Sequence, residues 1–180
     1  KLLIPVHMHT NGTLVAEEHC TGVLSLFEAV SVTFLGGDAE THDAMTKTPG
    51  SFERSIRGAK AVVATPGLRL GIAMCVHQGN FHEVSDMIRF AEDLGASCVA
   101  HFNFIPVGRG LNMVHGDITP AQREELLAIL NAKMQAGGMG VISTAPQLGR
   151  VCLAGAAIAG GRVSCSHAGS GSGVKARVVA

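Results

Sequence analysis

Short apolar runs alternate along the chain with longer segments in which apolar residues recur at helical spacing. The runs predict strands at Leu2–His9, Val30–Leu35, Leu68–Val76, Cys98–Ile105 and Val141–Ser143. The longer segments predict helices over Leu14–Phe27, from Ser51 to the stop at Pro66-Gly67, over Phe81–Leu94, and from Thr119-Pro120 to Gly137-Gly138. The segment from Asp38 to Gly50 is expected to be a loop, and no regular structure is predicted from Val151 onward.

This alternation of strands and helices predicts an α/β protein. Successive strands begin about thirty residues apart, which is typical of parallel βα units joined by right-handed crossovers. A complete α/β barrel needs about 250 residues, and this chain has 180. We therefore expect a partial barrel of the TIM type over residues 1–150, followed by a Gly/Ser-rich tail over residues 151–180.

Composition and charge narrow the possible partners. Fourteen basic residues balance fourteen acidic ones, so no overall charge favours nucleic acid or an anionic membrane. No apolar run reaches the roughly 18 residues that span a bilayer. The five cysteines are odd in number and widely spaced, without a CxxC pair, which favours a reducing, cytoplasmic compartment.

Polar residues gather where the predicted strands end, and active sites of parallel α/β proteins lie in the loops that follow the strands. The candidates are His7, His9 and Asn11 after the first strand, Thr33 on the second, His77 and Asn80 after the third, and Asn103 and Arg109 after the fourth.

The histidines allow a metal-dependent hydrolase as an alternative. His7 and His9 point to the same side of a strand, and His77 and His101 are the only further ligands in register. Ordinary hydrogen-bonded barrel histidines are the interpretation we favour, because no Asp accompanies them. A non-catalytic α/β binding module is a third alternative.

Four weaker features accompany these histidines. The glycine pairs in Gly36-Gly37-Asp38 and Gly108-Arg109-Gly110 could bring backbone amides to an anion, although each is also an ordinary turn sequence. Cys75 is a candidate thiol nucleophile, with a small core residue as the simpler interpretation. His42-Asp43 is a candidate acid/base couple, with a solvated pair as the alternative.

The order of several motifs resembles one enzyme family. The motifs are, in chain order, Thr10-Asn11-Gly12-Thr13-Leu14, Val30-Ser31-Val32 with the segment Gly36 to Asp43, the segment Pro49 to Gly58, the segment Gly71 to Asn80, and Asn103 to Gly110. Together they resemble radical S-adenosylmethionine enzymes over residues 8 to 150, from about the third strand of a six-strand partial barrel to the sixth. Ser143 to Gln147 is similar to the branch with an auxiliary-cluster extension, which includes enzymes of heme and pyrroloquinoline quinone biosynthesis and peptide maturases.

Two parts of the family pattern have no match in this sequence. Neither the CxxxCxxC loop that binds a 4Fe-4S cluster nor the Gly-Gly-Glu-Pro element appears, and both are expected upstream of Lys1. Leu35 stands where the family usually has Asp, whereas Thr33 keeps a hydroxyl at the usual Ser position. The resemblance therefore implies that this chain alone holds no cluster or other metal and is inactive.

For the complete protein, the resemblance implies an oxidoreductase that uses a 4Fe-4S cluster to cleave S-adenosylmethionine reductively and abstract hydrogen from substrate. A ferredoxin or flavodoxin would donate the electron, and the substrate would be a small molecule or a peptide. The expected cofactor-binding residues are Asn11, Thr33, Arg57, His77, Asn80, Asn103 and Arg109. The resemblance assigns no catalytic residue.

Overall fold

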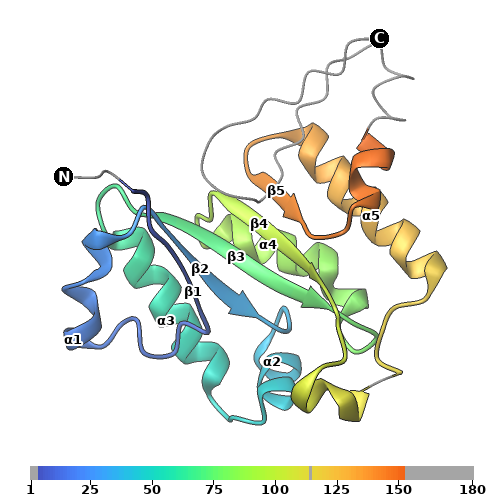
Figure 1. The fold of residues 1–180 in the computed structure, drawn as a ribbon. Helices are drawn as coiled ribbons and strands as arrows, with labels where there is room; N and C mark the ends of the chain where they lie inside the picture. The colour runs from blue at the N-terminus through green and yellow to red at the C-terminus, as the bar shows by residue number, and fades with distance from the viewer. Residues whose placement is uncertain (1–3, 114, 153–180) are drawn as a thin grey trace.

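Five parallel strands form one sheet in sequence order, β1-β2-β3-β4-β5 (Figure 1). The computed structural model describes residues 4–113 and 115–152, without the side chains of His19 and Arg109. The strands are β1 His7–Thr10, β2 Ala29–Phe34, β3 Arg69–Val76, β4 Cys98–Asn103 and β5 Gly140–Ser143. The prediction of a parallel α/β sheet is confirmed.

Helices connect the strands. They are α1 Glu18–Thr21, α2 Ala39–Thr46, α3 Ser51–Ala64, α4 Val84–Asp93 and α5 Pro120–Ala136, with 3-10 turns η1 Leu24–Leu26, η2 Phe81–Glu83 and η3 Gly108–Met113. Thr119 begins α5 with a reciprocal capping box to Gln122, so the Thr119-Pro120 start signal is confirmed. Within the described residues, no helix is long and apolar enough to cross a membrane.

The core lies between the sheet and the long helices. Figure 1 looks onto the opposite face, with α3 and α4 behind the sheet. Alternate residues of β2 and β3 are large, apolar and fully covered, because they face the helices: Val30, Val32, Phe34, Leu70, Ile72, Met74 and Val76. The apolar stripes of the helices complete the core with Ala59, Val62, Met87, Ile88, Ala91, Leu126, Leu127 and Leu130.

The sheet is curled, as a partial barrel requires. His9 on β1 and Phe102 on β4 have ring centroids 6.1 Å apart, although β2 and β3 lie between their strands. In a flat sheet the two strands would be about 14 Å apart, at about 4.8 Å per strand. We call the concave side, which carries both rings, the inner face.

The α3 helix packs very closely on the turn after β1. Gly12 adopts a left-handed conformation with φ of 78°, and its carbonyl oxygen lies 2.1 Å from the position that a Cβ on Gly58 would take. The hydroxyl of Ser55 donates to the carbonyl of Asn11 at 2.6 Å. Glycine at both positions therefore lets helix and turn meet backbone to backbone.

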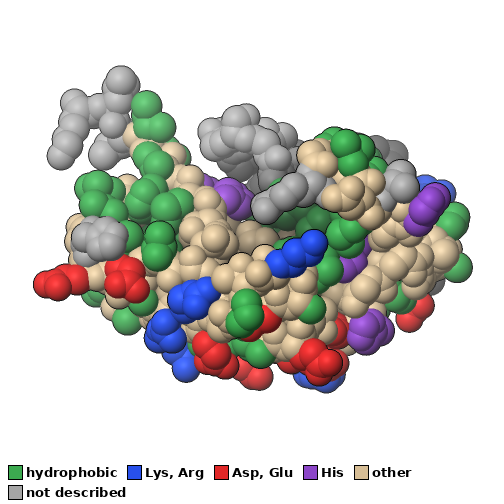
Figure 2. Space-filling model, turned by 90° about the horizontal axis from the view of Figure 1, so that it is seen from below, with side chains coloured by type: hydrophobic (Ala, Val, Ile, Leu, Met, Phe, Trp, Pro, Cys, Tyr) green, Lys and Arg blue, Asp and Glu red, His purple; other side chains and the backbone are tan. Residues whose placement is uncertain are grey.

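The predicted helix over Leu14–Phe27 is wrong. Only α1 and the η1 turn form there, and Leu14, Val23 and Leu26 stay 46–71% exposed. Hydrophobic side chains accordingly gather over this segment at the left of Figure 2. A helix in a protein is stabilised mainly by packing one apolar face, and these three side chains stay uncovered by the described residues.

The predicted loop from Asp38 to Gly50 is also wrong, because it contains α2. The Asp38 carboxylate accepts from the backbone N–H of Thr41 at 2.9 Å and caps this helix. No apolar stripe announces α2 in the sequence, since His42 is its only buried residue. Smaller differences concern element ends: β1 begins at His7, β4 ends at Asn103, and the segment after Val76 enters α4 through η2. Residues 147–152 are helical, whereas no regular structure was expected from Val151 onward.

Candidate functional site at the strand ends

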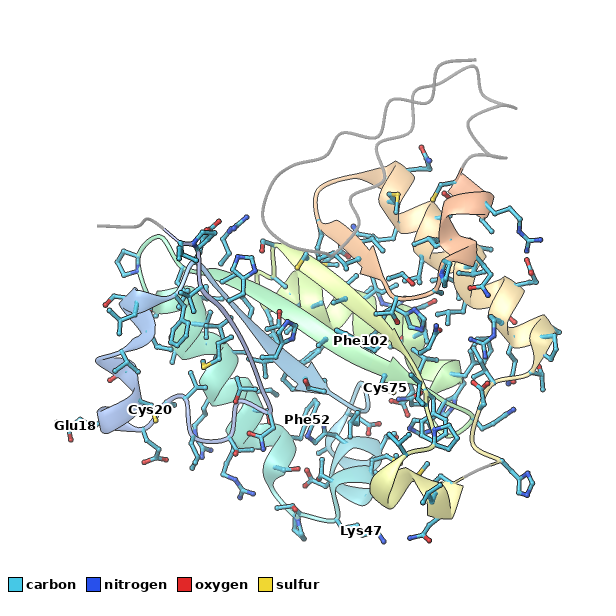
Figure 3. The ribbon with its side chains drawn as sticks, in the orientation of Figure 1. Glu18, Cys20, Lys47, Phe52, Cys75 and Phe102 are labelled. Atoms are coloured by element: carbon cyan, nitrogen blue, oxygen red, sulfur yellow. The ribbon has the colours of Figure 1, made fainter. Side chains whose placement is uncertain are left out.

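The inner face of the sheet is lined by small and polar side chains. On β2 they are Ser31 and Thr33, and on β3 they are Gly71, Ala73 and Cys75, since residues two apart on a strand point to the same side. Cys75 pairs in register with Phe102 of β4, and the two lie side by side in Figure 3. Gly71 and Ala73 are buried, whereas Ser31, Thr33 and Cys75 are half-buried.

The loop after β3 is anchored by Asn80. Its side-chain amide donates to the carbonyls of Leu35 and Cys75, both at 3.0 Å, and its Oδ1 accepts from the backbone N–H of His77 at 2.8 Å. Asn80 is completely buried. It therefore ties the carboxyl end of β2 to that of β3, and both its amide hydrogens are used within the protein.

The imidazole of His77 sits in this loop between Glu83 and Phe104. Its Nδ1 accepts from the backbone N–H of Gly79 at 3.0 Å, and its ring centroid lies 6.1 Å from that of Phe104. Burial lowers the pKa of His77, an effect that the Glu83 carboxylate partly offsets. His77 is thus a neutral ring near pH 7, at the edge where the family's cofactor is expected.

Glu83 holds the neighbouring loop after β2. Its Oε2 accepts from the backbone N–H of Gly37 at 2.6 Å, and its Oε1 accepts from the hydroxyl of Thr41. The amide of Gly37 is therefore already bonded to a carboxylate, so the Gly36-Gly37 turn does not offer it to an anion. Sequence reasoning missed Glu83, although its place three residues after Asn80, at a helix start, was a possible signal.

Thr33, Asn11 and Arg57 lie in different surroundings. Thr33 is half-buried on the inner face of β2. Asn11 is exposed in the turn after β1, where its Oδ1 accepts from the backbone N–H and the hydroxyl of Thr13. Arg57 is exposed on α3. The structure therefore brings Thr33, His77 and Asn80 to one end of two paired strands, and Arg57 lies on a covering helix.

Asn103 lies toward α5 and the end of β5. Its Oδ1 accepts from the Arg123 guanidinium at 3.3 Å, and its backbone N–H donates to the Thr144 hydroxyl at 3.0 Å. These contacts make it a link between β4, β5 and α5. Its role toward a cofactor stays a prediction, as does that of Arg109, whose side chain lies outside the described residues.

His42 and Asp43 have separate structural surroundings, which argues against an acid/base couple. His42 is buried against the rings of Phe34 and Phe52, and burial lowers its pKa. The Asp43 carboxylate accepts from the backbone N–H of Phe52 at 2.8 Å and from the Ser51 hydroxyl at 2.9 Å, at the start of α3. The bond from Phe52 is the largest cause that lowers the pKa of Asp43.

The other candidates for chemistry are similarly constrained. Burial raises the pKa of the Cys75 thiol, which disfavours the nucleophilic thiolate. His101 faces the helices, where its Nδ1 lies 2.9 Å from the Ser143 hydroxyl, away from the inner-face His9. In the described parts of the chain, no group of three or more His, Cys, Asp or Glu residues could hold a metal ion. The hydrolase alternative therefore gains no ligand set here, and these residues do not fit an iron-sulfur cluster.

Comparisons with known proteins agree with the fold. The chain is 33% identical over 121 residues to the AdoMet-dependent heme synthase of Nitratidesulfovibrio vulgaris, which covers 67% of this chain and 33% of the relative. It is 29% identical over 109 residues to the antilisterial bacteriocin subtilosin biosynthesis protein AlbA of Bacillus subtilis, covering 59% and 24%. No family model matches the chain.

Solved structures show the same fold at low sequence identity. SuiB of Streptococcus suis bound to its precursor peptide SuiA has a TM-score of 0.62 at 12% identity, covering 79% of this chain and 32% of SuiB. The protein anSMEcpe, with bound AdoMet and the Kp18Cys peptide, has a TM-score of 0.60 at 17% identity, covering 78% and 41%.

The fold is that of a partial α/β barrel of the TIM type, with the candidate site at the carboxyl ends of its strands. The chain belongs to the radical S-adenosylmethionine enzyme family. It spans about a third of the length of the curated heme synthases that it matches.

Proposed function

We propose that the chain is the later part of a radical S-adenosylmethionine enzyme core. In the complete protein, a 4Fe-4S cluster would supply the electron for reductive cleavage of S-adenosylmethionine, which leads to hydrogen abstraction from substrate. The observation that carries this proposal is the inner face, where small residues and a buried imidazole lie at the strand ends of a chain related to AdoMet-dependent enzymes.

The chain's own residues would bind and enclose the cofactor. Thr33 offers a hydroxyl on the inner face, and His77 offers, at the same edge, a buried ring nitrogen that has no partner among the described residues. Such an orphaned polar atom fits a site that is completed by a ligand. Asn80 would act indirectly, through the loop that it anchors. The other proposed cofactor-binding residues are Asn11, Arg57, Asn103 and Arg109.

The substrate is a small molecule or a peptide. Relatives named as heme synthases support a tetrapyrrole, and SuiB, bound to a precursor peptide, supports a peptide. An electron donor such as ferredoxin or flavodoxin and a cytoplasmic location belong to the same proposal.

Anaerobic reconstitution tests this function. We would compare this chain with a version extended upstream through its native gene, counting iron and measuring S-adenosylhomocysteine binding and 5′-deoxyadenosine formation in both. We expect only the extended version to gain about four irons in its core site and to form 5′-deoxyadenosine. Zinc bound by the short chain, with neither version cleaving S-adenosylmethionine, would instead support the hydrolase.

A further inference from the structure

One buried nitrogen at the strand ends has no hydrogen-bond partner in the part of the chain that the structure describes. Among the buried side-chain nitrogen and oxygen atoms of the described residues, only Nε2 of His77 and Oδ1 of Asn131 lack a hydrogen bond. The His77 side chain is enclosed, with 2% of the residue exposed. Buried polar atoms without partners are uncommon because they lose their bonds to water on folding. The exception at His77 therefore needs an explanation.

The hydrogen bonds of the ring define what this nitrogen can do. Nδ1 accepts from the backbone N–H of Gly79, so it carries no hydrogen of its own. Burial also lowers the pKa of His77, which keeps the ring neutral. A neutral imidazole with a bare Nδ1 carries its hydrogen on Nε2. The orphaned atom is therefore a hydrogen-bond donor.

This donor is held in a fixed place. The backbone N–H of His77 donates to Asn80, and its carbonyl accepts from the backbone N–H of Asn80 at 3.1 Å and of Phe81 at 2.9 Å. Asn80 in turn is anchored on both neighbouring strand ends. A side chain supported in this way keeps its orientation before a ligand arrives.

Neighbouring groups do not use the donor. The two oxygens of Glu83 accept from Gly37 and Thr41. Phe104, from the segment after β4, packs its ring against the imidazole and has no acceptor oxygen or nitrogen in its side chain. The described residues therefore contain no acceptor for the Nε2–H of His77. A ligand atom that reaches Nε2 must displace part of the packing around the imidazole ring.

We propose that the Nε2–H of His77 donates a hydrogen bond to an acceptor atom of a ligand bound at the carboxyl end of β3. The inference rests on the proposed function for the choice of ligands. The acceptor belongs either to the adenosyl part of the cofactor or to a carboxylate of the second reactant, and binding moves Phe104 away from the ring. His77 would then determine which ligands fit this edge of the barrel.

Binding measurements on the full-length, reconstituted protein test the proposal. The probes are S-adenosylhomocysteine and iron coproporphyrin III, which offers carboxylates. His77→Asn keeps a side-chain oxygen that can accept from Gly79, but it removes the N–H at the position of Nε2. His77→Gln instead keeps an N–H donor near the position of Nε2. Asn131→Ala, at the other unpartnered atom on α5, is the matched control, and thermal unfolding verifies that each variant is folded.

We expect His77→Asn to weaken binding of one probe about tenfold, with His77→Gln closer to wild type and Asn131→Ala unchanged. The affected probe identifies the source of the acceptor. In 15N-histidine-labelled protein, the Nε2–H signal of His77 should shift when that probe binds. Wild-type binding that no His77 variant changes, with an unmoved signal, would overturn this inference alone. A wild-type protein that binds neither probe would overturn the proposed function with it.

Discussion

The two faces of the sheet differ in how their side chains are used. On the helix-covered face, β2 and β3 present large residues such as Phe34, Ile72 and Met74, which are fully buried. On the inner face the same strands present Thr33, Gly71 and other small residues. One face therefore provides most of the packing energy, and the other carries the candidate site. A strand that serves both purposes must alternate large and small residues, in addition to apolar and polar ones.

The largest expected effect separates the two faces by stability. Ile72→Ala opens a cavity under the helices and should lower the free energy of unfolding by about 2–5 kcal/mol. Thr33→Ala, on the inner face of the adjacent strand, should lower it by less than about 1 kcal/mol, because it leaves no large cavity. Urea unfolding of both variants measures the difference. Equal losses would show that the inner face is as tightly packed as the outer one.

The same contrast explains what could be predicted from the sequence. Long segments with clear periodicity, such as α3 and α5, and the apolar run of β3 were predicted correctly because they bury one continuous surface. The helix over Leu14–Phe27 was wrong because apolar spacing does not reveal whether a partner surface exists. The short α2 was missed because its stability comes from the Asp38 cap and from His42 packing on Phe34 and Phe52, outside the helix.

The positions of the candidate site residues in the fold could be predicted, but their contacts could not. Parallel strands end at one edge, so Thr33, His77 and Asn80 were correctly expected at strand ends. Which of their atoms remain available depends on contacts between distant segments, such as Asn80 with Leu35 and Glu83 with Gly37. Those contacts link residues about 45 positions apart, and no local pattern encodes them.

His101, a buried polar residue on the helix-covered face, provides the next test of how the two faces differ. Burial lowers the pKa of His101 to about 4, helped by the nearby Arg123, from an ordinary value of 6.5. The unfolded chain therefore binds a proton at a higher pH than the folded one. The stabilisation is complete above pH 6.5 and is lost as the pH falls toward 4. A pKa difference of about 2.5 corresponds to about 3 kcal/mol in all.

Urea unfolding at pH 7 and pH 5 measures this effect. In wild type, stability should fall over this interval, with smaller losses from His42 and His77, whose pKa values are also lowered. His101→Gln should lower stability at both pH values but show a clearly smaller fall between them. If the variant keeps the full pH dependence of wild type, His101 is accessible to protons in the folded state and the face is less tightly closed than described.

The smallest of these effects concerns the junction between the two faces, where α3 meets the turn after β1. Gly58→Ala places a methyl group where the carbonyl oxygen of Gly12 lies 2.1 Å away, so helix and turn must separate. Overpacking of this kind costs about 1–3 kcal/mol, which exceeds what alanine gains over glycine in a helix. Lys60→Ala, two residues later on the exposed side of α3, is the control and should change stability little.

Because Asn11 lies beside Gly12 and is bonded to Ser55, the displacement of α3 in Gly58→Ala should also increase amide hydrogen exchange in the turn. A stabilised Gly58→Ala variant would mean that α3 sits farther from the turn after β1 than described.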